Sequence, residues 1–305
     1  MLFGYHEMGY ACMEALLEVG AFVAALFTHQ DSPNEEIWWH SCATLASSHG
    51  IPTFAPGAID ASWVARIAAL GPAMIYSFSY RNLLSPEVLR LASIAALNLH
   101  PSLLPRYRGR APVNWVLVNG ERETGVTLHH MVARADAGDI VAQRAIAIED
   151  SDTALTLYRK LVPLGAELIR EYHPLIVTGR APRHPQDLSQ GNYYGRRRPD
   201  DGRIDWNWPA RRIFNLVRAV THPYPGAFCF VSGRKLFVWQ ARIAHEGGRR
   251  GEAGTVVDTA DDGSVEIAAG EGSVLIVCAQ FENHKEGRAR DVLELGAIAG
   301  AEKLS

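Results

Sequence analysis

Short apolar runs alternate with stretches of helical periodicity throughout the first 150 residues of the chain. This alternation is typical of an α/β fold, in which helices cover a largely parallel sheet. We therefore expect a Rossmann-like domain with a mostly parallel sheet. Its strands are expected at 2–5, 20–29, 73–80, 95–100, 125–131 and 140–148, and its helices at 8–19, 41–50 and 62–71.

The second half of the chain has a different pattern. We expect a helix over 151–176, capped by Ser151 and kinked or divided at Pro163. The polar stretch QDLSQGNYYGRRRPDDG at 186–202 indicates a linker or boundary. Beyond it, short apolar runs separated by turn residues predict a small antiparallel β-barrel of the OB-like type. We thus predict a Rossmann-like catalytic domain over 1–190 and an OB-like β-barrel domain over 191–305.

Composition limits the classes of function. The formal net charge of the 305 residues is −3, which does not favour a large nucleic-acid-binding surface. The four cysteines are far apart, which indicates reduced thiols rather than a disulfide framework or a metal site. The N-terminus lacks the pattern of a signal peptide, and no apolar run is long enough to span a bilayer. We expect a cytoplasmic protein.

The stretch LNLHPS at 97–102 places Asn98 and His100 at the end of an expected strand. Residues two apart on a strand point to the same side, and ligands of such sheets bind beyond the carboxyl ends of strands. An amide can donate hydrogen bonds to an oxygen that gains negative charge, and an imidazole can exchange protons near neutral pH. A structural histidine and a turn-forming asparagine are the alternative interpretation.

The longer segment decides between these interpretations. Asn98 and His100 are followed by Ser102-Leu103-Leu104-Pro105, then Gly109, then Asp136-Ala137-Gly138. This series resembles the 10-formyltetrahydrofolate-dependent formyltransferases. The resemblance implies that Asn98, His100 and Asp136 are catalytic. Asn98 would stabilise the oxyanion, His100 would carry the proton, and Asp136 would make His100 more basic.

Three branches of this family compete. The glycinamide ribonucleotide branch is shorter and lacks a β domain. The methionyl-tRNA branch has a basic surface facing tRNA, whereas residues 200–305 here hold 13 Lys/Arg against 15 Asp/Glu. The third branch acts on amino sugars attached to nucleotides. A further alternative is a folate- or sugar-nucleotide-binding protein that has the fold of the enzyme but no catalytic activity. Binding alone would not require Asn98, His100 and Asp136 together.

The third branch shares the most sequence with this chain. GYHEMG, YSFSYRNLL, GRAPVNWVLVNGERETGVTLH and YYGRRRPDDGRIDW resemble the formyltransferase domain of the enzyme that modifies UDP-4-amino-4-deoxy-L-arabinose. The resemblance implies formylation of the 4-amino group of that sugar nucleotide in lipid A modification, the pathway of polymyxin resistance. Methionyl-tRNA formyltransferase is the alternative. The implied partner is a nucleotide-sugar substrate, without nucleic acid or membrane insertion, and a homo-oligomer is compatible with the sequence.

The resemblance also implies a set of contacts to the co-substrate 10-formyltetrahydrofolate, and it implies no metal. These contacts are Asn82, Leu83, Leu84, Arg110, Val132, Ala133, Arg134, Ala135 and Asp136. Ordinary loop packing is the alternative interpretation for residues 82–84. Arg106, Arg108 and Arg110 could also meet a diphosphate, since guanidinium groups pair well with phosphate oxygens. No G-x-G-x-x-G motif follows the first strand, which argues against a dinucleotide cofactor.

Overall fold

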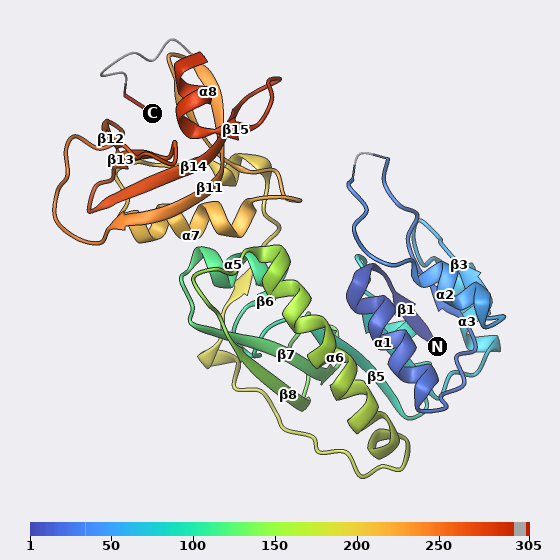
Figure 1. The fold of residues 1–305 in the computed structure, drawn as a ribbon. Coiled ribbons are helices and arrows are strands. Elements are labelled where there is room, and N and C mark those ends of the chain that lie inside the picture. The colour runs from blue at the N-terminus through green and yellow to red at the C-terminus, as the bar shows by residue number, and fades with distance from the viewer. Residues whose placement is uncertain (34, 296–302) are drawn as a thin grey trace. The chain divides into compact units, whose positions relative to one another are not determined.

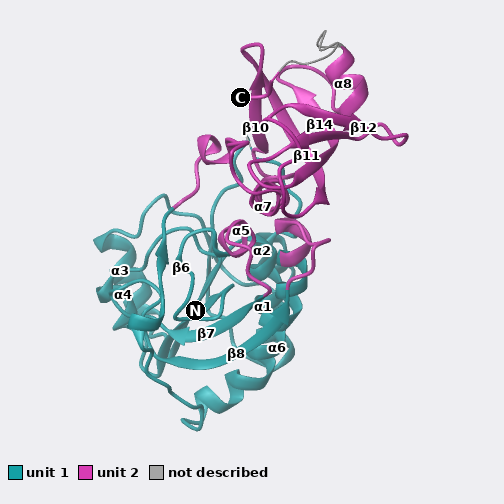
Figure 2. Ribbon diagram, turned by 90° about the vertical axis from the view of Figure 1, so that its left-hand side faces the viewer, with its two compact units in different colours: residues 1–112, 123–147, 158–195 teal, residues 113–122, 148–157, 196–305 magenta. Residues whose placement is uncertain are grey.

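The computed structural model describes residues 1–33, 35–295 and 303–305. Their contacts group them into two compact units (Figure 2). Unit 1 comprises 1–112, 123–147 and 158–195, and unit 2 comprises 113–122, 148–157 and 196–305. Each unit therefore gathers segments that are separate in sequence. The predicted boundary after residue 190 separates two domains that would fold independently. This boundary stays a prediction.

The centre of unit 1 is a seven-stranded sheet in the order β3-β2-β1-β4-β5-β7-β8 (Figure 1). The first five strands in that order are parallel, and β7 and β8 are antiparallel to their neighbours. The expected mostly parallel α/β sheet is therefore confirmed. The strands are β1 (Leu2–Gly4), β2 (Leu26–Phe27), β3 (Thr53–Phe54), β4 (Met74–Phe78), β5 (Ala95–His100), β7 (Glu123–His130) and β8 (Ile140–Ala147).

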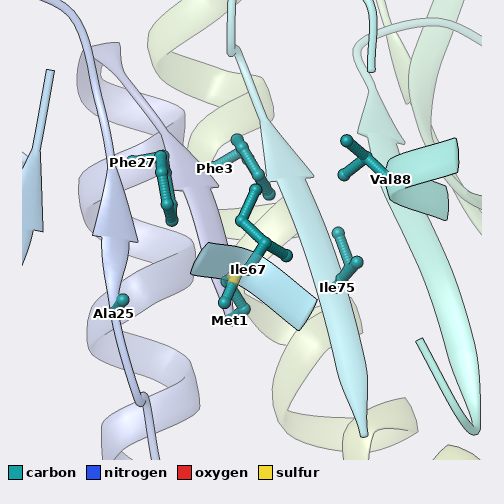
Figure 3. Packing of buried hydrophobic residues seen from close by; sticks show 7 residues of the cluster. All are labelled: Met1, Phe3, Ala25, Phe27, Ile67, Ile75 and Val88. Carbon is teal, nitrogen blue, oxygen red and sulfur yellow. The ribbon is translucent and has the colours of Figure 1, made fainter. Parts of the chain in front are cut away.

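Helices cover both faces of this sheet. Helices α3 (Ala61–Ala69) and α4 (Pro86–Leu89) place Ile67 and Val88 on one face, in a cluster with Met1, Phe3, Ala25, Phe27 and Ile75 (Figure 3). Asp60 and Ser85 cap these two helices through their side chains. The resulting apolar cluster, here called the α3/α4 cluster, supports the face of the sheet that carries the site described below.

Helices α1 (His6–Glu18) and α6 (Ala154–Val177) cover the opposite face. The Tyr76 hydroxyl of β4 lies 2.9 Å from Nδ1 of His173 on α6. A Cβ on Gly165 of α6 would stand 2.6 Å from the side chains of both Leu99 and Met8, so these side chains would have to shift to admit it. Helix α2 (Cys42–Ser48) packs beside α1.

Two expectations for unit 1 and its border are wrong, and the helix division considered at Pro163 does not occur. The strand expected over 20–29 is reduced to β2, because only Leu26 and Phe27 pair with both β1 and β3. Helix α6 begins at Ala154 rather than Ser151, since Thr153 and Thr156 exchange side-chain and amide hydrogen bonds at its start. Pro163 does not divide the helix, which continues to Val177.

Unit 2 contains an antiparallel sheet in the order β10-β11-β14-β13-β12, with β15 paired to β14. An antiparallel sheet domain in the C-terminal half is therefore confirmed. Its elements are α7 (Ala210–Val220), β10 (Ala227–Val231), β11 (Arg234–His245), β12 (Val256–Thr259), β13 (Val265–Ala268), β14 (Ser273–Phe281), β15 (Gly287–Arg288) and α8 (Ala289–Leu295). Helix α5 (Pro112–Val118) and the short helix η2 (Pro199–Gly202) also lie in this unit, except Pro112. No helix in the described ranges is long and apolar enough to cross a membrane.

The polar stretch after residue 185 is not a free linker over its first part. The strand β9 (Tyr193–Tyr194) pairs with β6 (Arg108–Gly109), and a short helix η1 (Leu188–Gln190) precedes it. Asn192 accepts a hydrogen bond from the Tyr107 amide at 2.6 Å and, through its carbonyl, one from Arg108. Residues 186–195 therefore belong to unit 1, where they lie against the loop that follows β5.

Candidate active site

Asn98 and His100 lie at the carboxyl end of β5, as the sequence predicted. In the parallel register Asn98 pairs with Ser77, and Ser77 pairs with Phe3 of the α3/α4 cluster, so Asn98 and His100 stand on that face of the sheet. On the other side, β7 places His129 opposite Asn98 and Thr127 opposite His100. The site therefore begins on a strand that is held on both sides.

The loop after His100 is fixed by buried hydrogen bonds. The Thr127 hydroxyl donates to the Ser102 carbonyl at 2.6 Å and accepts from the Leu104 amide at 3.1 Å. The Gln143 amide group donates to the same hydroxyl and to the Leu104 carbonyl. The Ser102 hydroxyl donates to the Arg106 carbonyl at 2.8 Å. The Ser-Leu-Leu-Pro segment is thus a rigid brace for His100.

His100 is 5% exposed, and its two ring nitrogens have different neighbours. Nε2 lies 2.8 Å from the Tyr107 carbonyl, and because a carbonyl can only accept, Nε2 carries a hydrogen. Nδ1 lies 3.6 Å from Oδ1 of Asp136. Nδ1 is therefore the nitrogen left to gain and lose a proton, and an imidazolium formed there would face a carboxylate.

Asp136 reaches His100 from the loop after β7, in a left-handed conformation with φ of 52°. Its Oδ2 accepts a hydrogen bond from the Gly109 amide at 2.8 Å. Burial opposes ionisation of this carboxyl, but its polar surroundings, foremost the nearby His100 and with it the hydrogen bond from the Gly109 amide, outweigh burial and hold its pKa below the ordinary range. Asp136 is therefore a carboxylate at neutral pH. Gln186 supports its loop by donating to the Asp136 and Gly138 carbonyls.

A fourth side chain, His129, joins this group. It is 1% exposed, and its Nε2 lies 3.1 Å from Nδ2 of Asn98 and 3.5 Å from Oδ1 of Asp136. The adjacent residues His129 and His130 face opposite sides of the strand; His129 is buried and His130 is half-buried. The contact of His129 with Asn98 was missed, because it depends on the β5–β7 register. The only signal in the sequence was a histidine on a neighbouring strand that could stand on the same face of the sheet as Asn98.

Backbone strain is concentrated around these residues. In the described part of the chain, left-handed φ angles occur at seven non-glycine residues, among them Tyr107 and Asp136 on either side of His100. His6 and Ser79, which follow β1 and β4 at the same edge of the sheet, are two others. Such strain is typical of functional sites, where packing holds the chain in unfavourable conformations.

Chemically, the group brings together an amide donor, an imidazole that can exchange protons and a partly buried carboxylate. This arrangement suits the attack of a neutral nucleophile on a carbonyl carbon, where an oxyanion forms and a proton must move. In the described residues, no three His, Cys, Asp or Glu side chains are grouped so that they could hold a metal ion.

The residues expected to contact folate lie on two loops. Asn82, Leu83 and Leu84 follow β4, and Val132, Ala133, Arg134 and Ala135 follow β7. Leu84 and Met131 pack against the α3/α4 cluster, which brings both loops to the same face of the sheet. Leu83 is 78% exposed and Val132 is 44% exposed. Each of these two loops thus presents an apolar side chain to solvent.

The arginines after His100 differ in their surroundings. The Arg110 amide donates to the Tyr194 carbonyl at 2.9 Å, and its side chain is exposed. Arg108 is 4% exposed, and its Nε and Nη1 have no hydrogen-bond partner among the described residues. Farther along, in unit 2, the Arg197 guanidinium lies over the Trp115 ring. A diphosphate contact by these arginines stays a prediction.

Comparison with protein families identifies this arrangement. A formyl transferase model matches residues 21–171, and the model of the formyl transferase C-terminal domain matches residues 197–295. The chain is a formyltransferase. The first match contains Asn98, His100 and Asp136, and the second lies in the part of the chain that forms unit 2.

Solved structures share the fold of this formyltransferase. An N-formyltransferase from Helicobacter canadensis, in complex with folinic acid and dTDP-3-aminofucose, is 18% identical, with a TM-score of 0.71 over 92% of this chain and 98% of that one. A sugar N-formyltransferase from a Shewanella species is 20% identical, with a TM-score of 0.62 over 78% and 95%. HypX from Aquifex aeolicus with tetrahydrofolic acid is 22% identical, with a TM-score of 0.58 over 81% and 43%. At these identities the likeness establishes the fold.

Proposed function

We propose that this formyltransferase moves a formyl group from 10-formyltetrahydrofolate to the 4-amino group of a nucleotide-linked amino sugar. The acceptor favoured by the sequence is UDP-4-amino-4-deoxy-L-arabinose, which would place the reaction in lipid A modification. The observation that carries the proposal is the convergence of Asn98, His100 and Asp136 at one strand end. The similar N-formyltransferase from Helicobacter canadensis, solved in complex with folinic acid and dTDP-3-aminofucose, supports a sugar-nucleotide acceptor.

In the proposed reaction the unprotonated sugar amine attacks the formyl carbon, and the bond from that carbon to N10 of the folate then breaks. Asn98 donates a hydrogen bond to the oxygen that becomes negative, and such a donor typically contributes about 3 kcal/mol to lowering the barrier. His100 takes the proton of the amine on Nδ1 and returns a proton to the leaving nitrogen. Asp136 stabilises the imidazolium between these steps.

The folate fits the loops on the α3/α4 face. Leu83 and Val132 offer apolar contacts to a planar ring system, while the backbone groups of residues 82–84 and 132–136 can form hydrogen bonds to its edge. Exposed apolar side chains on two loops that reach the same face of the sheet are more typical of a ligand site than of ordinary loop packing. We therefore assign these segments and Arg110 to folate binding.

A substrate panel tests the proposal. Purified protein is incubated with 10-formyltetrahydrofolate and, separately, with UDP-linked 4-amino sugars, dTDP-linked 3-amino sugars and methionyl initiator tRNA, and tetrahydrofolate release is followed. We expect turnover with UDP-4-amino-4-deoxy-L-arabinose. Turnover only with a 3-amino sugar would reject the acceptor but keep the class, whereas turnover only with the tRNA would reject both.

A further inference from the structure

The side chain of His129 is absent from the trio that the sequence singles out, yet it touches two of its members. It stands on β7 directly opposite Asn98 of β5. Its Nε2 lies 3.1 Å from Nδ2 of Asn98, and this is the only hydrogen bond of the Asn98 side chain within the described residues. The protonation of the His129 ring therefore also determines the orientation of the Asn98 amide.

The other ring nitrogen determines that state. Nδ1 of His129 lies 2.9 Å from the carbonyl of His130, and a carbonyl oxygen can only accept a hydrogen bond. The hydrogen of a neutral His129 ring therefore sits on Nδ1. Nε2 then carries a lone pair, and the group at 3.1 Å must donate to it. The NH2 of Asn98 can do so, whereas its carbonyl oxygen cannot.

A doubly protonated His129 would give a different arrangement. Nε2 would then donate, and Oδ1 of Asp136 at 3.5 Å would be its charged partner. Asp136 lies at a similar distance, 3.6 Å, from Nδ1 of His100, so one carboxylate would serve two imidazolium rings. The neutral ring avoids this sharing of one carboxylate.

We propose that His129 is a positioning residue that acts through Asn98. As a neutral ring protonated on Nδ1, it accepts one N–H of the Asn98 amide and so determines which amide atoms face the reacting carbonyl. The second N–H of Asn98 then remains for the oxyanion, in an orientation set before the substrate arrives. Such preorganised donors act mainly on the transition state. This role rests on the proposed function of Asn98.

Kinetics of matched variants test the role. His129→Met removes the acceptor, and His129→Gln retains an acceptor oxygen near the position of Nε2. His130→Met is the control, since it makes the same change on the neighbouring residue, which points to the other side of the strand. We expect His129→Met to lower kcat about 10- to 100-fold with little change in KM, since the lost alignment acts on the transition state, as for oxyanion donors. His129→Gln should recover most of that loss, and His130→Met should retain near-normal kcat.

A double-mutant cycle distinguishes positioning from a separate effect. In an Asn98→Ala background, His129→Met should lower kcat no further, because the group through which it acts is already missing. Losses in kcat that multiply in the double variant, or a rise in KM without a fall in kcat, would overturn the proposal. If His129→Met does not fold, the nitrogen-15 measurement of the wild-type ring described next tests the proposal without that variant.

The tautomer can be read without any turnover. Protein labelled with nitrogen-15 in its histidine rings should show a neutral His129 protonated on Nδ1 at neutral pH, and the signal is assigned by its loss in His129→Gln. A ring protonated on Nε2, or on both nitrogens, would overturn the proposal. Absence of formyl transfer with every acceptor would instead reject the proposed function, so the two failures are distinguishable.

Discussion

Nδ1 of His100 faces Oδ1 of Asp136 at 3.6 Å, while Nε2 of the same ring is bound to the Tyr107 carbonyl. One nitrogen of the ring thus holds it in place, and the other lies beside a fixed negative charge, where our proposal has it exchange protons. The Gly109 amide holds the second oxygen of that carboxylate at 2.8 Å. The contact between His100 and Asp136 therefore depends on three segments: strand β5, the Ser-Leu-Leu-Pro segment after it and the loop after β7.

Asp136→Asn should lower kcat about 100-fold or more, in the range of lost acid–base assistance. The variant keeps an oxygen that can accept the Gly109 amide hydrogen, but it loses the charge that stabilises an imidazolium on His100. Asp139→Asn is the matched control three residues away, where the carboxylate pairs with Arg183 instead. Steady-state turnover measures both variants. Equal losses in the two would contradict the role of Asp136.

The acid stability of the protein should depend on Asp136. Its pKa in the folded protein lies below the ordinary range, whereas in the unfolded chain it is about 3.9. The carboxylate therefore stabilises the fold fully above about pH 5, and this contribution is lost as the pH falls through the lower folded pKa. Urea unfolding of wild type and Asp136→Asn from pH 7 to pH 3 should show a constant difference that shrinks below about pH 4. A difference that grows in acid would refute the depressed pKa.

Gly109→Ala should damage both stability and activity. Gly109 has a φ of 98°, and a Cβ there would stand 2.2 Å from the Tyr194 carbonyl. We expect a loss of about 2 kcal/mol in the free energy of unfolding, together with a fall in kcat as the amide shifts away from Asp136. Gly57→Ala is the control, because nothing lies within 4 Å of its Cβ position. Similar urea midpoints for the two variants would show that the close approach is not rigid.

His6 should make the protein less stable as the pH falls below 7. Burial and, to a lesser extent, Arg81 lower the pKa of His6 to about 3. Between that value and about 6.5, the pKa of an unfolded histidine, the unfolded chain binds more protons, so acid favours unfolding by at most about 1.4 kcal/mol per pH unit. His6→Asn preserves the left-handed backbone, since asparagine tolerates it. Between pH 7 and pH 5 the variant should lose less stability than wild type; an equal slope would mean that His6 titrates normally.

The sequence predicted the parts of the site that are local and missed those that depend on pairing. Asn98 and His100 could be placed because a strand end and a period of two are visible in six residues. Asp136 required a family resemblance, since its contact with His100 spans 36 residues of sequence and rests on a left-handed turn. His129 needed the antiparallel register of β5 and β7. Neither propensity nor hydrophobic pattern sets that register.

The segment 186–195 is a second case in which the structure depends on contacts that the local sequence does not reveal. Its polar, glycine-containing sequence indicates a linker, and nothing local contradicts that interpretation. Its order comes from outside partners: the β6–β9 pairing, the bonds of Asn192 to the backbone of Tyr107 and Arg108, and the bonds of Gln186 to the loop of Asp136. The strands β4 and β5, by contrast, followed from apolar runs long enough to be recognised directly in the sequence.

Transfer of a carbon-13-labelled formyl group tests the central claim most directly. Wild-type protein, Asn98→Ala and His100→Ala are each mixed with labelled 10-formyltetrahydrofolate and UDP-4-amino-4-deoxy-L-arabinose, and the products are followed by carbon-13 NMR. We predict a labelled formamide on the sugar with the wild type, and almost none with the two variants, although they still bind both substrates in calorimetry. A labelled sugar formed at the wild-type rate by either variant would contradict the account.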